Sequence, residues 1–147
     1  MGVLINNSQN RYRIRQEGIR QMARAILSAL DCPDGELSIL IEDDKGIAEL
    51  NSEYLHRKGP TNVISFPMHD GKSPALNDIL GDVVISIETA EREGTEEGTG
   101  MKKRFAELLI HGILHLFGYD HEKNHYQARK MRKKAAELMK IVEGIEL

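Results

Sequence analysis

Residues 111–121 of this chain read HGILHLFGYDH, a stretch that contains three of its six histidines. His111 and His115 are four residues apart, so on a helix both imidazoles project from the same face, one turn apart. Gly118 can end such a helix in a left-handed cap, which glycine adopts without strain. The chain then turns back, and His121 is close enough to complete a set of three ring nitrogens. We therefore predict a metal site formed by His111, His115 and His121.

The ligand set indicates which metal to expect. Three protein ligands leave a fourth position for water or substrate, which is typical of catalytic rather than structural zinc. The predicted cofactor is one Zn²⁺ ion, and another divalent transition metal such as copper, nickel or iron would accept the same ligands. The helix around the first two histidines is apolar on most sides, and buried imidazoles without partners are costly. A bound ion would satisfy both. His56, His69 and His125 lie outside this motif and receive no role.

The same spacing occurs in the metzincin zinc proteases, which carry a glutamate after the first histidine as general base. Gly112 occupies that position here. The sequence therefore argues against peptide hydrolysis by that mechanism, although a bound ion would still act as a Lewis acid. Nothing in the sequence identifies a general base.

The pattern around the motif predicts an α+β fold: about four strands in a mixed sheet, packed with four to five helices. The metal site lies at the end of a central buried helix. Apolar runs predict strands at residues 3–6, 37–42, 62–67 and 81–87. Helical spacing predicts helices at residues 18–30, 44–54, 88–93, 101–117 and 124–142. Glycine, proline and polar residues predict loops at residues 69–79 and 94–100.

Composition fits an ordinary globular chain. With 147 residues, 40% hydrophobic and 29% charged, we predict a single metal-binding hydrolase domain over residues 1–147. Cys32 is the only cysteine, so neither an intrachain disulfide nor a cysteine metal cluster can form. The most apolar stretch, residues 108–117, is far too short to span a membrane, and the first residues lack a signal-peptide pattern. We expect a cytoplasmic protein with no membrane partner.

A net charge of −3 means that any nucleic-acid contact must come from local basic surface. Candidate surfaces are residues 11–15, 102–104 and 129–134, although a basic run of this kind is, taken alone, more often an ordinary solvated face. Aromatic residues make up only 5% of the chain and tryptophan is absent. The chain therefore offers few aromatic side chains on which the bases of a single strand could stack.

Residues 111–121 resemble the histidine motif of the YbeY family, the metal-dependent endoribonucleases of bacterial ribosomal RNA maturation. Residues 60–67 (PTNVISFP) and 80–86 (LGDVVIS) resemble the two strands that precede that motif, and the resemblance covers roughly residues 36–143. It implies one α+β domain whose cleft holds a zinc-like ion. It further implies cleavage of single-stranded RNA, processing of the 3′ end of small-subunit rRNA, and a part in ribosome quality control. The implied partners are rRNA and small-subunit ribosomal proteins, and DNA is not expected.

The chain departs from the family pattern at one position. The family often has arginine directly after the tyrosine that precedes the Pro-Thr-Asn segment, whereas Leu55 follows Tyr54 here. Arg57, in the same turn, is the candidate catalytic cation. Arg57 and Lys58 are both candidates for binding a substrate phosphate, and a solvated basic turn is the alternative.

Two acidic residues in the matched segments are candidates for supporting roles. Asp82 lies in the second strand motif, and Asp120 directly precedes the third histidine. Asp120 can either accept a hydrogen bond from a ligand histidine or cap the turn that follows Gly118.

Two other functions remain open at this point. One is a non-catalytic ribosome assembly factor with a structural metal, which Leu55 and Gly112 favour. The other is a metallohydrolase of a different substrate class, such as a peptide or a small phosphoester.

Overall fold

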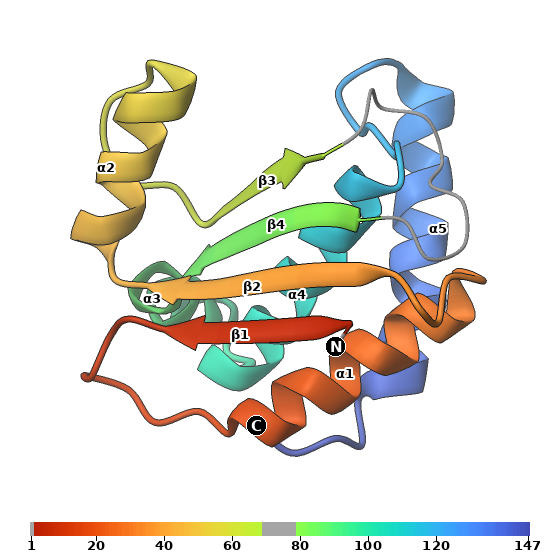
Figure 1. Ribbon diagram of the computed structural model, residues 1–147, viewed down its shortest axis with the longest axis horizontal. Helices are drawn as coiled ribbons and strands as arrows, with labels where there is room; N and C mark the ends of the chain where they lie inside the picture. Colours follow the sequence, from red (N-terminus) through yellow and green to blue (C-terminus); the bar gives the residue numbers. More distant parts are fainter. Residues whose placement is uncertain (1, 69–78) are drawn as a thin grey trace.

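A four-stranded mixed sheet forms the middle of the molecule (Figure 1). The computed structural model describes residues 2–68 and 79–147. Strands β1 (Val3–Asn7), β2 (Glu36–Glu42) and β4 (Ile79–Ser86) run parallel, and β3 (Val63–Pro67) runs antiparallel to β4. The strand order β1-β2-β4-β3 leaves β1 and β3 at the two edges. The alternating burial along β2 is the period of two expected for a strand with one face on the core.

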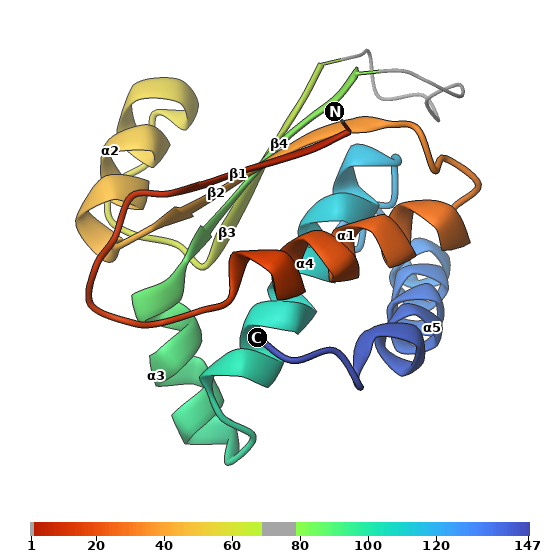
Figure 2. The same ribbon diagram turned by 60° about the horizontal axis from the view of Figure 1, so that its bottom comes forward.

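Five helices flank the sheet: α1 (Gln16–Ala29), α2 (Asp44–Leu55), α3 (Ile87–Glu97), α4 (Met101–Leu116) and α5 (His125–Val142). Helices α1, α4 and α5 lie on one side of the sheet, and α2 lies on the other (Figure 2). The expected α+β architecture is therefore confirmed, with five helices and four strands in the described residues. None of the described helices is both long and apolar enough to cross a membrane.

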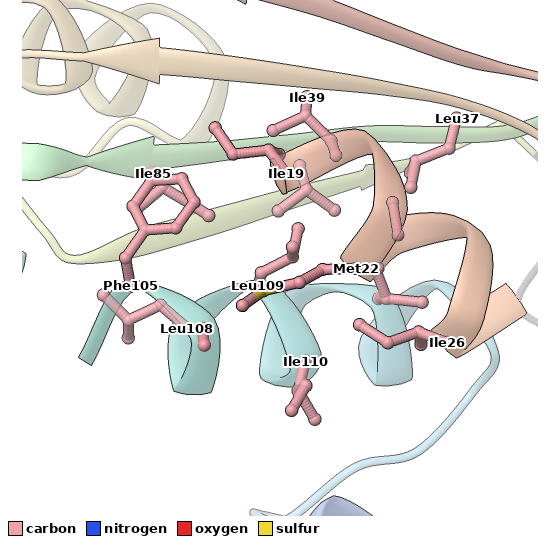
Figure 3. Close-up of a cluster of buried hydrophobic side chains, with 14 of the residues drawn as sticks. Ile19, Met22, Ile26, Leu37, Ile39, Ile85, Phe105, Leu108, Leu109 and Ile110 are labelled. Carbon is pink, nitrogen blue, oxygen red and sulfur yellow. The ribbon is translucent and has the colours of Figure 1, made fainter. Parts of the chain in front are cut away.

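Helix α4 is the central element of the core. Phe105 and Leu109 on this helix are fully buried, and they pack among side chains from α1 and the sheet (Figure 3). Burying one such side chain stabilises the fold by about 1.5–3 kcal/mol. Because most faces of α4 are covered, its C-terminal end is held in a fixed position relative to the sheet.

Gly112 brings α4 directly against the sheet. A Cβ atom at this position would lie 2.6 Å from Cγ1 of Val83 and 3.1 Å from Cγ2 of Val63. The hydroxyl of Ser65 donates a hydrogen bond of 2.8 Å to the Gly112 carbonyl oxygen, which ties the helix to β3. There is consequently no room here for the glutamate that metzincins carry after the first histidine.

The main difference from the sequence prediction concerns α3. The predicted loop at residues 94–100 is wrong in its first half, because α3 continues to Glu97. Gly94 lets the chain turn back closely, since its carbonyl oxygen accepts hydrogen bonds from the backbone of both Thr99 and Gly100. A Cβ atom at residue 94 would overlap the backbone of Gly100, so this glycine serves close packing rather than a loop. The predicted loop at residues 69–79 lies outside the described residues except for Ile79, which begins β4.

Candidate metal centre

The three histidines of the motif meet at the C-terminal end of α4. Their candidate ligand nitrogens all lie within 4.8 Å of one another. The Nε2 atoms of His111 and His115 are 3.0 Å apart, and the ring of His121 lies 4.9 Å from that of His111 between centroids. A tetrahedral zinc ion with Zn–N bonds of about 2.0–2.1 Å needs nitrogens roughly 3.3–3.4 Å apart. The donor set and its spacing therefore fit a single ion after small movements of the side chains.

The turn after α4 places His121 beside the other two. Gly118 has φ of 90°, its N–H donates to the His115 carbonyl, and the N–H of Tyr119 donates to the Leu114 carbonyl. This pair of hydrogen bonds is the Schellman motif, in which glycine takes the left-handed position. The predicted helix-ending role of Gly118 is confirmed, with α4 ending at Leu116.

Asp120 supports the same turn. Its Oδ1 atom accepts a hydrogen bond of 2.9 Å from the backbone N–H of Glu122. Of the two roles considered for Asp120, this contact supports the turn-capping one. Burial and His121 lower the pKa of His115, and the charge of the nearby Asp120 carboxylate opposes this lowering without reversing it.

Burial keeps the first two imidazoles neutral. Burial, together with the charges of His115, His121 and Arg104, lowers the pKa of His111 to about 4. Burial also lowers the pKa of His115, with a further contribution from His121. A histidine binds metal through a neutral ring nitrogen, so both side chains are in the required form at neutral pH.

A cleft of about 740 Å³ opens over the histidines. It is lined by the three histidines and Glu122, by the end of α2 and the turn after it, and by the segment that leads into β3. Arg57 and Lys58 are exposed and both line this cleft. The structure thus brings these two predicted cations into one site with the predicted metal ligands. His56 and His125 do not line this cleft, and His69 lies outside the described residues.

The sequence reasoning missed Asn51, which holds the basic turn in place. Asn51 is only 5% exposed. Its side-chain Nδ2 atom donates a hydrogen bond of 3.0 Å to the Gly59 carbonyl oxygen. Its backbone carbonyl oxygen accepts a hydrogen bond of 3.2 Å from the backbone N–H of Arg57. These bonds span the turn that carries Arg57 and Lys58. Its position one turn after Ile47, on the buried face of α2, was the signal that could have identified it.

Asn62, also in the cleft wall, is oriented by a second network. Its amide nitrogen donates 3.3 Å to Oε1 of Glu93, and Nε of Arg104 donates 2.9 Å to the same oxygen. Arg104 also pairs with Glu97 and Glu107. Among the basic residues considered for RNA contact, Arg104 is therefore engaged within the protein.

Asp82 has no place in this site. It pairs with Phe66 across the β3–β4 ladder, and the next residue, Val83, faces α4 at Gly112. Because successive side chains of a strand point to opposite faces, Asp82 lies on the face of the sheet away from the histidines.

Comparisons with known proteins show which family this chain is similar to. Residues 4–143 match the family model described as "Endoribonuclease YbeY". A protein of that name from Geobacter metallireducens is 50% identical over 145 residues, covering 97% of each chain. Another from Aquifex aeolicus is 45% identical over 120 residues, covering 82% of this chain and 79% of that protein. A solution structure from Thermotoga maritima superposes with a TM-score of 0.69 at 22% identity, covering 97% of this chain and 89% of that one. At that identity the superposition supports the fold alone.

Proposed function

The chain belongs to the endoribonuclease YbeY family, and we propose that it cleaves single-stranded RNA with a metal ion held by His111, His115 and His121. As a member of that family it is an RNA-cleaving hydrolase that acts in ribosomal RNA processing. The observation that carries the proposal is the cleft itself, where three imidazoles and two cationic side chains line one space. We propose zinc as the ion because three imidazoles suit it best.

Each residue of the cleft has its own role in the proposed RNA cleavage. A bound divalent ion supplies Lewis-acid polarisation of a phosphoryl oxygen or of a water molecule. Arg57 and Lys58 bind the phosphate, and Arg57 stabilises the negative charge that builds up on it. Asn51 keeps both cations over the cleft by holding their turn. Asn62 offers its amide oxygen to the substrate, because its amide nitrogen is held by Glu93.

Several features of the proposal are finer than family membership. The cleft has the volume of a small-ligand pocket, which suits one or two nucleotides of a single strand rather than a duplex. The resemblance of the three motifs to the family supports the 3′ end of small-subunit rRNA as substrate, together with a role in ribosome quality control. It also supports contacts with small-subunit ribosomal proteins and a cytoplasmic location.

The alternatives fit the structure less well. A structural metal would be expected where the fold needs it, yet α4 is packed through its own apolar side chains, and His121 is exposed. We therefore expect metal removal to abolish activity while leaving the protein folded, whereas a structural ion would contribute folding energy directly. A peptidase of the metzincin type would need a general base where Gly112 contacts the sheet.

The test is cleavage of a single-stranded rRNA fragment by purified protein, with and without a chelator. The informative variant is His111→Ala, and the matched control is His125→Ala, because His125 is exposed on α5 and outside the cleft. We expect cleavage by the wild type and by His125→Ala, and none after chelation or in His111→Ala. Equal cleavage by folded His111→Ala protein would contradict the proposed site.

A further inference from the structure

Strand β3 is an edge strand, and its free edge forms one wall of the metal cleft. Among the described residues it pairs only with β4. Ser65 faces α4, where it bonds to Gly112, whereas Ile64 packs with Ile47 of α2 on the opposite face of the sheet. Both Ser65 and Ile64 nevertheless line the cleft. Residues from opposite faces can share one cleft only where that cleft follows the edge of the strand.

The register shows which backbone groups point from this edge. The Ser86 N–H donates 3.0 Å to the Asn62 carbonyl at one end of the ladder, and the Met68 N–H donates 3.1 Å to the Leu80 carbonyl at the other. Hydrogen-bonded pairs alternate along an antiparallel ladder. Counting from either end, residues 64 and 66 bond to β4, so residues 63, 65 and 67 direct their backbone groups outward.

Residue 67 agrees with this register. It is a proline, which has no N–H to donate, and prolines within sheets occur where no ladder bond is lost. The outward groups are therefore the N–H and C=O of Val63, the N–H and C=O of Ser65, and the C=O of Pro67. No described residue accepts or donates a hydrogen bond at the outward groups of Val63 and Ser65.

These groups match what an unstacked nucleobase requires. An N–H donor beside a C=O acceptor complements the donor and acceptor on the edge of a base, and single-stranded RNA is recognised through such edges. The two sets are two residues apart, about 6.6–6.8 Å along the strand. Among the described residues, the cleft lining contains no Phe, Tyr or Trp. The aromatic rings there are the three histidines proposed to hold the metal, so little of the stacking that commonly holds single strands is available. Backbone hydrogen bonds provide a different way to hold bases.

We propose that the outer edge of β3 binds nucleobases through the backbone N–H and C=O groups of Val63 and Ser65. The strand of RNA then lies along the edge, with its bases toward β3 and its phosphates toward Arg57 and Lys58. This inference rests on the proposed function for the class of substrate. An extended peptide is the other ligand that an edge strand can bind, and the experiment below separates the two.

The experiment measures amide hydrogen exchange by NMR on the intact, metal-loaded protein. Three ligands are compared: a 2′-O-methyl RNA heptamer, the same heptamer with abasic central positions, and an extended heptapeptide. Binding of each is measured separately by fluorescence anisotropy. The amides of Ile64 and Phe66 are internal controls, because they already bond to β4 and should be protected in every sample.

We expect the heptamer to slow exchange at Val63 and Ser65 by roughly 2- to 12-fold, the range that corresponds to the net value of one hydrogen bond. The abasic heptamer should lose this protection because its phosphates remain but its bases do not. Binding of the heptamer without added protection at Val63 and Ser65, or equal protection by the abasic strand, would overturn the inference. Protection by the peptide alone would also overturn it and assign the edge to a polypeptide. Cleavage of unmodified RNA, measured in parallel, shows whether the proposed function stands when the edge inference fails.

Discussion

Substitution of Gly112 by alanine probes the contact that positions the metal centre. The new Cβ atom would lie 2.6 Å from Cγ1 of Val83, a fully buried and β-branched side chain on β4. Because neither Val83 nor the backbone of β4 can move freely in a close-packed core, α4 must shift away from the sheet. His111 is the adjacent residue, so the shift moves the first ligand of the site.

The magnitude follows from two opposing effects. Overpacking a core costs about 1–3 kcal/mol, and replacing glycine by alanine within a helix returns about 0.5–1 kcal/mol. We expect a net loss of stability of up to about 2 kcal/mol, which for a domain of this size lowers the melting temperature by roughly 2–4 °C per kcal/mol. Activity should fall further than stability, because a misplacement of about 1 Å in an active site can cost about 100-fold in rate.

Urea unfolding and RNA cleavage are the two assays, and a double-mutant cycle with Val83→Ala tests the cause. Removing the Val83 methyl groups removes the clash, so the two substitutions should be less harmful together than the sum of their separate effects. Coupling of about 0.5–3 kcal/mol is typical of residues in contact. Gly144→Ala is the matched control, since a Cβ atom there meets no atom within 4 Å. Strictly additive effects, or full activity in Gly112→Ala, would refute this reasoning.

Three further predictions concern other residues. Burial is the largest single influence on the pKa of Asp44, and it raises that pKa. Hydrogen bonds from Ser86, Arg92 and Thr89, together with the charge of Arg92, lower it by more, so the pKa of Asp44 lies below its usual value. The ionised Asp44 carboxylate therefore stabilises the folded state above its unfolded-state pKa of about 3.9, and this contribution is lost as pH falls through the lower folded-state value. Asp44→Asn should lower the free energy of unfolding at pH 7. It should also weaken the dependence of that free energy on pH below about pH 4, as measured in urea titrations. Asn51→Ala should lower cleavage and cost about 0.5–1.5 kcal/mol in unfolding experiments, because the turn loses the hydrogen bond from Asn51 to the Gly59 carbonyl; unchanged activity would mean that the turn needs no such support. Arg57→Ala should reduce kcat for RNA cleavage more than the matched change Arg24→Ala at an exposed position of α1. An equal small effect of both would remove Arg57 from the proposed mechanism.

The metal motif could be predicted because its information is local. The i, i+4 spacing of His111 and His115 and the glycine at residue 118 determine a helix face and a helix end without reference to the rest of the chain. The central buried helix was likewise visible in its apolar composition. The structure then placed all three histidine rings together.

Other features required contacts between distant segments. The sequence showed that Gly112 lacks the metzincin glutamate, but only the packing of α4 on Val83 and Ser65 shows why a side chain is excluded there. Asp82 belonged to a motif shared with the family, yet the strand alternation directs it to the opposite face of the sheet. The helical extension to Glu97 depended on the close approach of Gly94 to Gly100, which polar composition alone hides.

The most direct test of the central claim is a titration of Zn²⁺ into metal-stripped protein, with cleavage of a single-stranded RNA as the readout. We predict that cleavage is absent at the start, rises with added metal and reaches a plateau at one ion per chain. His125→Ala should follow the same curve, and His111→Ala should show no rise at that stoichiometry. Full cleavage by the stripped protein, or an equal rise in His111→Ala, would contradict the assignment of the three-histidine cleft as the metal-dependent active site.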